Sequence, residues 1–354
     1  MPFCVKSEAF IACQLIGQQG IGIATTVRVT ALIVTLLAAW TGLARQSGDR
    51  SVRWVDVLRQ GADWYIGDQA RAIADAVLLY QRASGGWPKD IDMTARPVSA
   101  DPAARDATID NGATTTQIRL LARVRDRQGR IESRHRDAAL RGLDYLLAAQ
   151  YPNGGWPQFF PLRDDYSRHI TFNDNAMVNV LLLLDEVSSG RPTFEFVDDG
   201  RRVKARDAVA RGAEVILKAQ IVVGSELTAW CAQHDEVTLQ PRGARAYEHA
   251  SLSGMESVGI VRFLMTRPAS PELTRSIDAA VAWLRRVRLD DSRWARFYEF
   301  GTNRPIFSGR DGVIRYNLDE IEQERRDGYA WLGAWPRALV DEEYPAWKNR
   351  ETAR

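Results

Sequence analysis

Two aspartates stand directly before apolar helical segments, and each is followed by an asparagine: Asp110-Asn111 and Asp174-Asn175. An Asp at a helix start caps free backbone N–H groups and faces the positive end of the helix dipole, so a structural role accounts for either one. If the loops bring the two together, their carboxylate and amide oxygens form a doubly negative cluster that suits a hard cation such as Ca²⁺. Asp110 and Asp174 are therefore candidate metal ligands.

Basic residues cluster near aromatic ones in two later loops. Arg245 stands close to Tyr247, and Arg296 and Arg310 flank a second aromatic stretch. Such residues can simply be solvated at the surface. Grouped guanidinium forks also match the repeated carboxylates of an acidic polymer, which makes these loops candidate substrate-binding elements.

Several common functional signals are missing from the sequence. It contains no Gly-x-Ser-x-Gly elbow, no phosphate-binding loop and no His-Glu-x-x-His motif. The formal net charge is only +2 and the basic residues are interspersed with acidic ones, so a nucleic-acid footprint is absent. Cys231 follows Trp230, and such an isolated cysteine is more often a packed apolar residue than a nucleophile.

The elements that position these residues follow a helical period. Apolar residues recur at three- and four-residue spacing in segments separated by long loops rich in Gly, Pro, Asp and Asn. We expect helices over Val57–Gln81, Gly112–Val124, Ala138–Gln150, Ala176–Val187, Ala208–Gln220, Ser257–Met265 and Leu273–Val287. The fold class is thus all-α, with long irregular loops that form the cleft.

An internal repeat organises these helices. Gly-Gly-Trp-Pro follows two of them, with the tryptophans at Trp87 and Trp156, and each following loop closes at an Asp-Asn pair that opens the next helix. Asp110 and Asp174 would thus occupy the same place in two repeats. A weaker third copy runs through Trp230 and lacks the acid. Three helical hairpins suggest a closed ring, and Trp87 and Trp156 are expected in the core between hairpins rather than stacked on sugar.

The first 44 residues differ from the rest. They hold only three charged residues, Lys6, Glu8 and Arg28, and end in an apolar run from residue 31 to 44. This pattern predicts a secretory signal peptide, with a membrane anchor as the alternative. Because Arg28 directly follows Val27, translation is hypothesised to start near Val27. Residues 45–354 are expected to form a single catalytic domain.

Taken together, the motifs resemble the pectate lyases of polysaccharide lyase family ten. The resembling segments cover residues 55 to 335 and are GGWPKDIDM at Gly85, TIDNGAT at Thr108, YPNGGWPQFFP at Tyr151, ITFNDNAMVNV at Ile170, WCAQHD at Trp230, ARAYEHASLSGMESVGIVRFLM at Ala244, ARFYEFGTNRPIFSGRDG at Ala295 and IEQERRDGYAWLG at Ile321. The resemblance implies an (α/α)₃ toroid-like module and Ca²⁺-assisted anti β-elimination on polygalacturonate.

The resemblance also implies residue roles. Asp110 and Asp174 look like the metal-linked carboxylates, and Arg245 looks like the catalytic base. Lys89, Arg296 and Arg310 resemble residues that grip substrate carboxylates. Arginine is normally fully protonated, so Ca²⁺ and neighbouring guanidinium groups would have to lower its pKa, and activity is expected to need alkaline pH.

Two alternatives remain open at this stage. A glycoside hydrolase on a helical toroid would use Asp110 and Asp174 as acid and base, and a non-catalytic protein would only bind polysaccharide. For the lyase we expect an exported monomer, extracellular or periplasmic, that binds acidic polysaccharide and has no nucleic-acid partner and no stable membrane association after processing. Endo or exo action and the tolerance of methyl esters are left undetermined.

Overall fold

The computed structural model describes residues 51–352; the predicted signal peptide and the hypothesised translation start near Val27 lie outside these residues. From Val52 onward the chain forms one compact unit. Its α-helices are α2 (Asp68–Tyr80), α3 (Thr115–Arg123), α4 (Ser133–Ala149), α5 (Ala176–Ser188), α6 (Asp199–Ala219), α7 (Glu256–Leu264), α8 (Pro271–Arg286), α9 (Gln323–Asp327) and α10 (Tyr344–Thr352). Among residues 51–352, no helix is both long enough and apolar enough to cross a membrane.

Short elements connect these helices. The 3₁₀ helices are η1 (Trp54–Asp56), η2 (Ala62–Ile66), η3 (Asp110–Gly112), η4 (Tyr166–Arg168), η5 (Asn173–Asn175), η6 (Pro192–Phe194) and η7 (Leu318–Glu320), and η8 (Leu339–Glu343) is a π-helix. The strands are two residues each: β1 (Ile170–Thr171), β2 (Val222–Val223), β3 (Glu226–Leu227), β4 (Gln233–His234), β5 (Pro241–Arg242), β6 (Leu252–Ser253), β7 (Trp294–Ala295), β8 (Phe297–Tyr298), β9 (Phe307–Ser308), β10 (Ile314–Arg315) and β11 (Leu332–Gly333). All strand pairings are antiparallel, and β1, β4 and β5 form the three-stranded sheet.

The mainly helical fold agrees with the sequence-based expectation, but several predicted helix starts are wrong. The predicted helix Val57–Gln81 begins only at Asp68, because Gly61 and Gly67 adopt extended backbone conformations that separate it from η2 and η1. The remaining predicted helices correspond to α3 through α8, of which α4 and α6 begin before the predicted starts at Ala138 and Ala208. The C-terminal pair η8 and α10 was not predicted.

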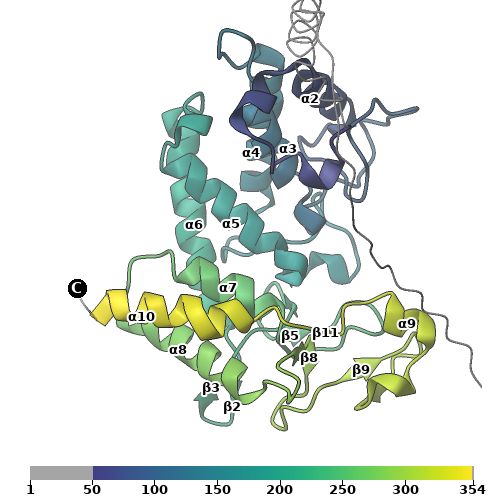
Figure 1. Cartoon of the computed structure of the whole chain (residues 1–354), viewed down its shortest axis with the longest axis vertical. Helices are drawn as coiled ribbons and strands as arrows, with labels where there is room; N and C mark the ends of the chain where they lie inside the picture. The colour runs from purple at the N-terminus through teal and green to yellow at the C-terminus, as the bar shows by residue number, and fades with distance from the viewer. Residues whose placement is uncertain (1–50, 353–354) are drawn as a thin grey trace, which may run out of the picture. The chain divides into compact units, whose positions relative to one another are not determined.

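The helices pack as pairs in chain order. α3 packs with α4, α5 with α6 and α7 with α8, while α4 contacts both α2 and α6 and α5 contacts both α3 and α7. In Figure 1 the α3–α4 pair lies at the top, α5 and α6 follow, and α7 and α8 lie below them. The strands β8, β9 and β11 gather with α9 beside this stack.

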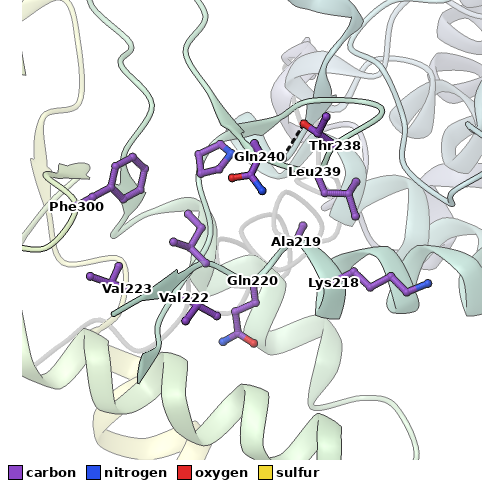
Figure 2. A pocket seen from close by; sticks show the side chains of 11 residues that line it. Lys218, Ala219, Gln220, Val222, Val223, Thr238, Leu239, Gln240 and Phe300 are labelled. Atoms are coloured by element: carbon purple, nitrogen blue, oxygen red, sulfur yellow. Dashed lines mark hydrogen bonds between the residues drawn. The ribbon is translucent and has the colours of Figure 1, made fainter. Parts of the chain in front are cut away.

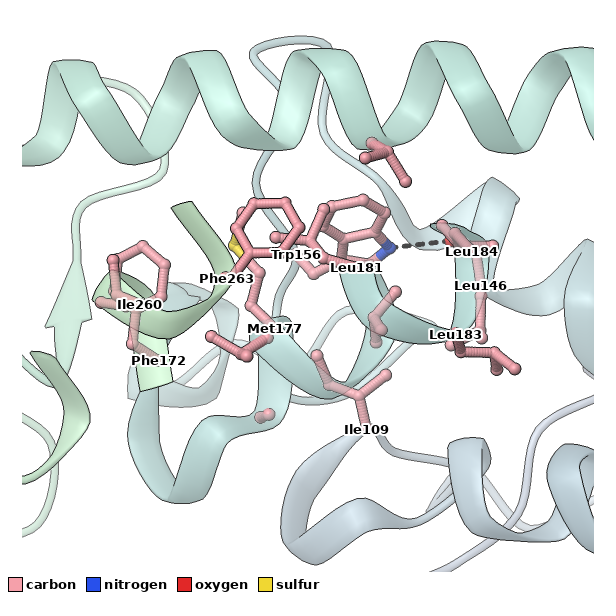
Figure 3. Close-up of a cluster of buried hydrophobic side chains, with 14 of the residues drawn as sticks. Ile109, Leu146, Trp156, Phe172, Met177, Leu181, Leu183, Leu184, Ile260 and Phe263 are labelled. Atoms are coloured by element: carbon pink, nitrogen blue, oxygen red, sulfur yellow. Dashed lines mark hydrogen bonds between the residues drawn. The ribbon is translucent and has the colours of Figure 1, made fainter. Parts of the chain in front are cut away.

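A tryptophan follows each of the helices α2, α4, α6 and α8 and donates a hydrogen bond back to it. Trp87 and Trp156 are fully buried, which confirms their expected core position. In Figure 3 the Trp156 indole lies beside Leu181 and Phe263, and its N–H donates to the Leu146 carbonyl at 2.8 Å. The same bond recurs in four copies: Trp87 to Val77, Trp156 to Leu146, Trp230 to Ile216 and Trp294 to Leu284. The copy at Trp294 shows that the repeat extends one unit beyond the three predicted.

A glutamine directly after each of α2, α4 and α6 joins that helix to α4, α6 and α8, respectively. The side-chain amide of each glutamine donates both to the following loop and to a backbone carbonyl of that next helix. The second set of bonds, all at 2.9 Å, is Gln81 to Ala138, Gln150 to Ala208 and Gln220 to Ser276. These buried bonds set the offset between successive repeats, and therefore the positions of the loops that follow them.

A glycine after α2 and another after α4 let the chain pass close to the backbone of the next helix in the stack. Gly85 and Gly154 have φ of +98° and +100°, and an added Cβ would collide with the backbone carbonyls of Arg141 and Arg211. Only glycine combines this backbone conformation with the contact to the next helix. The Gly-Gly-Trp-Pro motif is thus accounted for by packing.

Candidate active site

The loop after each tryptophan returns to it before the next helix begins. The backbone N–H of Thr108 donates to the Trp87 carbonyl at 3.0 Å, and that of Thr171 donates to the Trp156 carbonyl at 3.1 Å. Both loops therefore end at corresponding places, where η3 and η5 begin. The contacts between η3 and η5 bring the two helix starts together.

When the two repeats are aligned by their backbone structure, their Asp-Asn pairs are offset from each other by one residue. The left-handed position of η3 is Asn111, with φ of +50°, and that of η5 is Asp174, with φ of +51°. Asp110 thus corresponds to Asn173, and Asn111 to Asp174. The expectation that Asp110 and Asp174 hold the same place was wrong, because the Thr that pairs with each tryptophan sets the alignment.

A cavity of about 200 Å³ lies where these loops meet. It brings together four of the predicted site residues, Lys89, Asp110, Asp174 and Arg245. The side chains that join them in its lining are Asp90, Asn111, Gln158, Tyr166, Asn173, Gln233 and Glu248. The set is almost wholly polar, with two cationic and four acidic groups, which gives a formal charge of −2.

Asp110 is buried and tightly held. One of its carboxylate oxygens accepts hydrogen bonds from Lys89 Nζ and from the Gln158 amide, both at 2.6 Å. The other accepts from the backbone N–H of Asn111 at 3.0 Å. Burial lowers the pKa of Lys89, but the hydrogen bond and charge of Asp110 outweigh it and leave that pKa raised. Lys89 therefore enters the site as a fixed positive charge beside Asp110.

Asp174 is the more open of the two aspartates, with 32% of its side chain exposed. It accepts hydrogen bonds from Asn173 at 2.6 Å and from Arg296 at 3.0 Å. Burial raises its pKa; Arg296 lowers it, and the charges of Glu256 and Asp110 raise it further. This electrostatic interaction between Asp174 and Asp110 is what two carboxylates that share a cation site would show.

Arg296 lies beneath Asp174 rather than in the open cavity. Its side chain is 5% exposed and pairs with the fully buried Glu256 at 2.5 Å as well as with Asp174. In this arrangement the guanidinium faces protein carboxylates, which differs from the expectation that it grips the substrate. Glu256 begins α7, so the third repeat does supply an acid near its helix start, contrary to the sequence-based expectation.

Arg245 reaches the cavity from a loop that packs on a second, smaller core. That core comprises Tyr247, Phe297, Ile306, Phe307, Ile321 and Trp331. The guanidinium donates two hydrogen bonds to Glu248, at 2.7 and 2.5 Å, and the Tyr329 hydroxyl donates to the same carboxylate at 2.7 Å. The hydrogen bonds that Arg245 donates to the Glu248 carboxylate raise the pKa of Arg245. The expectation that neighbouring guanidinium groups lower this pKa was therefore wrong for the protein alone, because the nearest charge is an acid.

Arg310 is the one predicted site residue that lies away from both Asp174 and the cavity lining. Its side chain is 65% exposed and forms an ion pair with Glu324 at 3.0 Å. The sequence missed Glu248, Glu256, Gln158 and Gln233. Glu248 stands three residues after Arg245, which was its one available signal; the other three become recognisable only through the tertiary contacts.

The donor set of the cavity fits a hard cation. Two of its lining residues, Gln158 and Gln233, have a buried side-chain amide oxygen that accepts no hydrogen bond from the described residues. Buried acceptors without a donor are costly unless a ligand or cation satisfies them. With Asp110 and Asp174 they offer carboxylate and amide oxygens, the ligand types that Ca²⁺ prefers.

A second acidic group fits a cation less well. His169, Asp235 and Glu236 place ligand atoms within 4.8 Å of one another. However, Glu236 is paired with Arg168 at 2.7 Å, and Asp235 with Arg242 at 3.3 Å. Their charges are already matched by protein cations, so this group is accounted for as an ion-pair network.

Comparison with known proteins identifies relatives. The profile of the pectic acid lyase family matches residues 81–293 and 290–340. The family 10 polysaccharide lyase from Cellvibrio cellulosa is 38% identical, with a TM-score of 0.71, over 79% of this chain and 94% of that one. An Asp-to-Ala mutant of that lyase, in complex with trigalacturonic acid, is 37% identical with a TM-score of 0.72 over the same shares. No curated protein sequence matches the chain.

Proposed function

Because the chain belongs to the pectic acid lyase family and is a polysaccharide lyase, we propose that it cleaves polygalacturonate by Ca²⁺-dependent anti β-elimination. The substrate class is supported by the relative that was solved with trigalacturonic acid. The product would be an oligogalacturonide with a double bond between C4 and C5 at its new non-reducing end.

The observation that carries this proposal is the charge of the cavity. Four carboxylates and two cationic groups line it, so a polyanion alone would be repelled. The side-chain amide oxygens of Gln158 and Gln233, which accept no hydrogen bond from the described residues, are further acceptors that a cation would satisfy. Asp110 and Asp174 would hold a divalent cation, which would supply the positive charge that a polyanionic substrate needs here.

The elimination divides among the residues of the cavity. When bound, Ca²⁺ supplies Lewis-acid neutralisation of the uronate carboxylate, which makes the C5 proton more acidic. Asp174 and Asp110 would hold the cation, and the hydrogen bond from Lys89 keeps the Asp110 carboxylate in place. Arg245 would take the C5 proton; the electron pair then forms the C4–C5 double bond while the C4–O bond breaks, and the leaving oxygen takes a proton from solvent water.

Arg245 can accept a proton only after losing one, and its two bonds to Glu248 oppose that loss. The proposal therefore requires this contact to loosen when substrate and cation enter. Alkaline pH favours the neutral guanidine, so the rate should rise with pH. Lys89 is the proposed carboxylate-binding residue that lines the cavity, and Arg310 would have to leave Glu324 to join it.

The same family membership supports the finer structural and cellular proposals. The packed pairs α3–α4, α5–α6 and α7–α8 support an (α/α)₃ toroid-like module, although each joins the second helix of one repeat to the first helix of the next. The signal-like sequence before residue 45 supports export, to the periplasm or beyond, without lasting membrane association after processing. The monomeric state stays a prediction.

Product chemistry tests this function against the two alternatives. Purified protein is incubated with polygalacturonate and Ca²⁺, and both ultraviolet absorbance and reducing ends are followed. An eliminase gives equal amounts of unsaturated uronide and new reducing ends. Reducing ends without ultraviolet absorbance would indicate a hydrolase, and neither signal with retained polymer binding would indicate a non-catalytic protein.

A further inference from the structure

A second hollow of about 500 Å³ adjoins the proposed catalytic cavity. The two share Asp90 and Asn111, whose side chains are joined by a hydrogen bond of 2.8 Å from the Asn111 amide. The far side of the hollow is formed by η1, through Arg53, Trp54 and Val55. A polymer that continues past the catalytic cavity over Asn111 would therefore meet η1.

Trp54 differs from the tryptophans of the repeats. Its side chain is only partly buried, and its indole N–H donates to none of the residues 51–352. In the four repeat tryptophans, the indole N–H donates a hydrogen bond to a backbone carbonyl. An indole that lines a hollow, and whose N–H has no acceptor among residues 51–352, suits a sugar ring, which offers an apolar C–H face and hydroxyl acceptors.

The charges of this hollow differ from those expected for binding a uronate carboxylate. Its one cation is Arg53, whose guanidinium is already paired with Asp56 at 2.7 Å. Two acids, Asp90 and Asp92, also line it. A free carboxylate would find no unpaired partner here, whereas a methyl-esterified residue would bring no charge to balance.

We propose that η1 forms an outer subsite of the substrate cleft, in which Trp54 stacks on a galacturonan ring and accepts it whether or not its carboxylate is methyl-esterified. This inference rests on the proposed function, since the occupant is the next part of the same polymer. It goes beyond the family resemblance, because residues 53–55 precede the segment that the family profile matches, which starts at residue 81.

The test compares oligogalacturonates of increasing length. Trp54→Ala should lower kcat/KM on long oligomers about three- to tenfold, the scale of one aromatic contact. The shortest oligomer that the wild-type enzyme cleaves should be unaffected. Trp54→Phe keeps an aromatic ring packed at η1, so its kcat/KM on long oligomers should lie between those of the wild type and Trp54→Ala. This variant guards against the case in which Trp54→Ala fails to fold.

Phe300→Ala is the matched control. Phe300 is another partly exposed aromatic residue at a hollow, which is formed by the end of α6 and the β4–β5 connection and shares no residue with the catalytic cavity. Figure 2 shows its ring opposite Gln240 and Val223. This variant should leave the dependence on oligomer length unchanged.

Three results would overturn the proposed subsite. Trp54→Ala with the wild-type length dependence, or with an equal loss at every length, would show that Trp54 does not contact an outer ring. A loss confined to unesterified oligomers in Arg53→Ala would show that the hollow reads a free carboxylate. Lack of unsaturated product from the wild-type protein would contradict the proposed function alone, and the subsite would then be judged by calorimetric titration of the same oligomers.

Discussion

Arg245→Ala should reduce kcat by at least ~10²-fold, the scale expected for loss of a positioned proton acceptor. The fold should survive, because 45% of the Arg245 side chain is exposed and its removal leaves Glu248 with the hydrogen bond from Tyr329. Arg245→Lys should behave similarly, since a lysine lacks the planar fork that meets Glu248.

The size of the loss alone does not decide the role. If Arg245 only bound a substrate carboxylate, losing a charge-assisted hydrogen bond of about 1.5–3 kcal/mol would cost roughly 10- to 150-fold. That loss would appear mainly in KM and be recovered at high substrate concentration. The division between kcat and KM is therefore the informative quantity.

The assay is initial-rate formation of unsaturated uronide over a wide range of polygalacturonate concentration, at saturating Ca²⁺. Arg310→Ala serves as the comparison, because Arg310 is exposed, paired with Glu324 and outside the cavity lining. Near-normal kcat in Arg245→Ala would exclude Arg245 as the base. If Arg310→Ala loses kcat while Arg245→Ala retains it, the base assignment moves to Arg310.

Glu248→Gln gives an independent reading of the same role. Glu248 raises the pKa of Arg245, so removing its charge should lower that pKa and increase the neutral fraction at a given pH. The rise of rate with pH should then occur at lower pH than in the wild-type enzyme. A pH profile that stays in place, in a folded variant, would contradict the argument.

Three further predictions concern the cation and the substrate. Asp174→Asn should lose the response to Ca²⁺ while keeping the wild-type melting temperature; a normal Ca²⁺ response would remove Asp174 from the metal site. Arg296→Met should destabilise the fold by about 3–5 kcal/mol, because Glu256 loses its buried partner. In the fraction of this variant that folds, Ca²⁺ activation should be lost on acidification at a higher pH than in the wild type. The reason is that Arg296 lowers the pKa of Asp174, and only the ionised carboxylate can hold the cation. An acid limb of the pH profile that stays at its wild-type position would count against this prediction. Demethylated pectate should be cleaved faster than highly methylated pectin, and the reverse order would argue against carboxylate recognition in the catalytic cavity.

The sequence predicted the helical plan because its apolar spacing and glycine signals are local. It failed at Val57–Gln81, where the apolar spacing continues through Gly61 and Gly67 although the backbone does not. It also missed the fourth repeat at Trp294, because that loop carries no Gly-Gly-Trp-Pro motif to mark it.

The sequence predicted which residues line the candidate site better than it predicted what each of them contacts. Lys89, Asp110, Asp174 and Arg245 do meet in one cavity. Burial and partner choice depend on the tertiary contacts, so the pairing of Arg296 with Glu256 could not be predicted from the sequence. For the ion pair of Arg245 and Glu248, the three-residue spacing was the one available signal. The one-residue difference between the repeats has the same origin, since backbone bonds to the tryptophans set their register.

The central claim is that a cation held by Asp110 and Asp174 makes this cavity a pectate-cleaving site. The most direct measurement is the rate of unsaturated-uronide formation from polygalacturonate as free Ca²⁺ is raised from chelated conditions, in the wild-type enzyme and in Asp174→Asn. We expect no rate in chelator, a saturable rise with Ca²⁺ in the wild type, and a rise lost or moved to much higher Ca²⁺ in the variant. Full wild-type activity in excess chelator would contradict the claim.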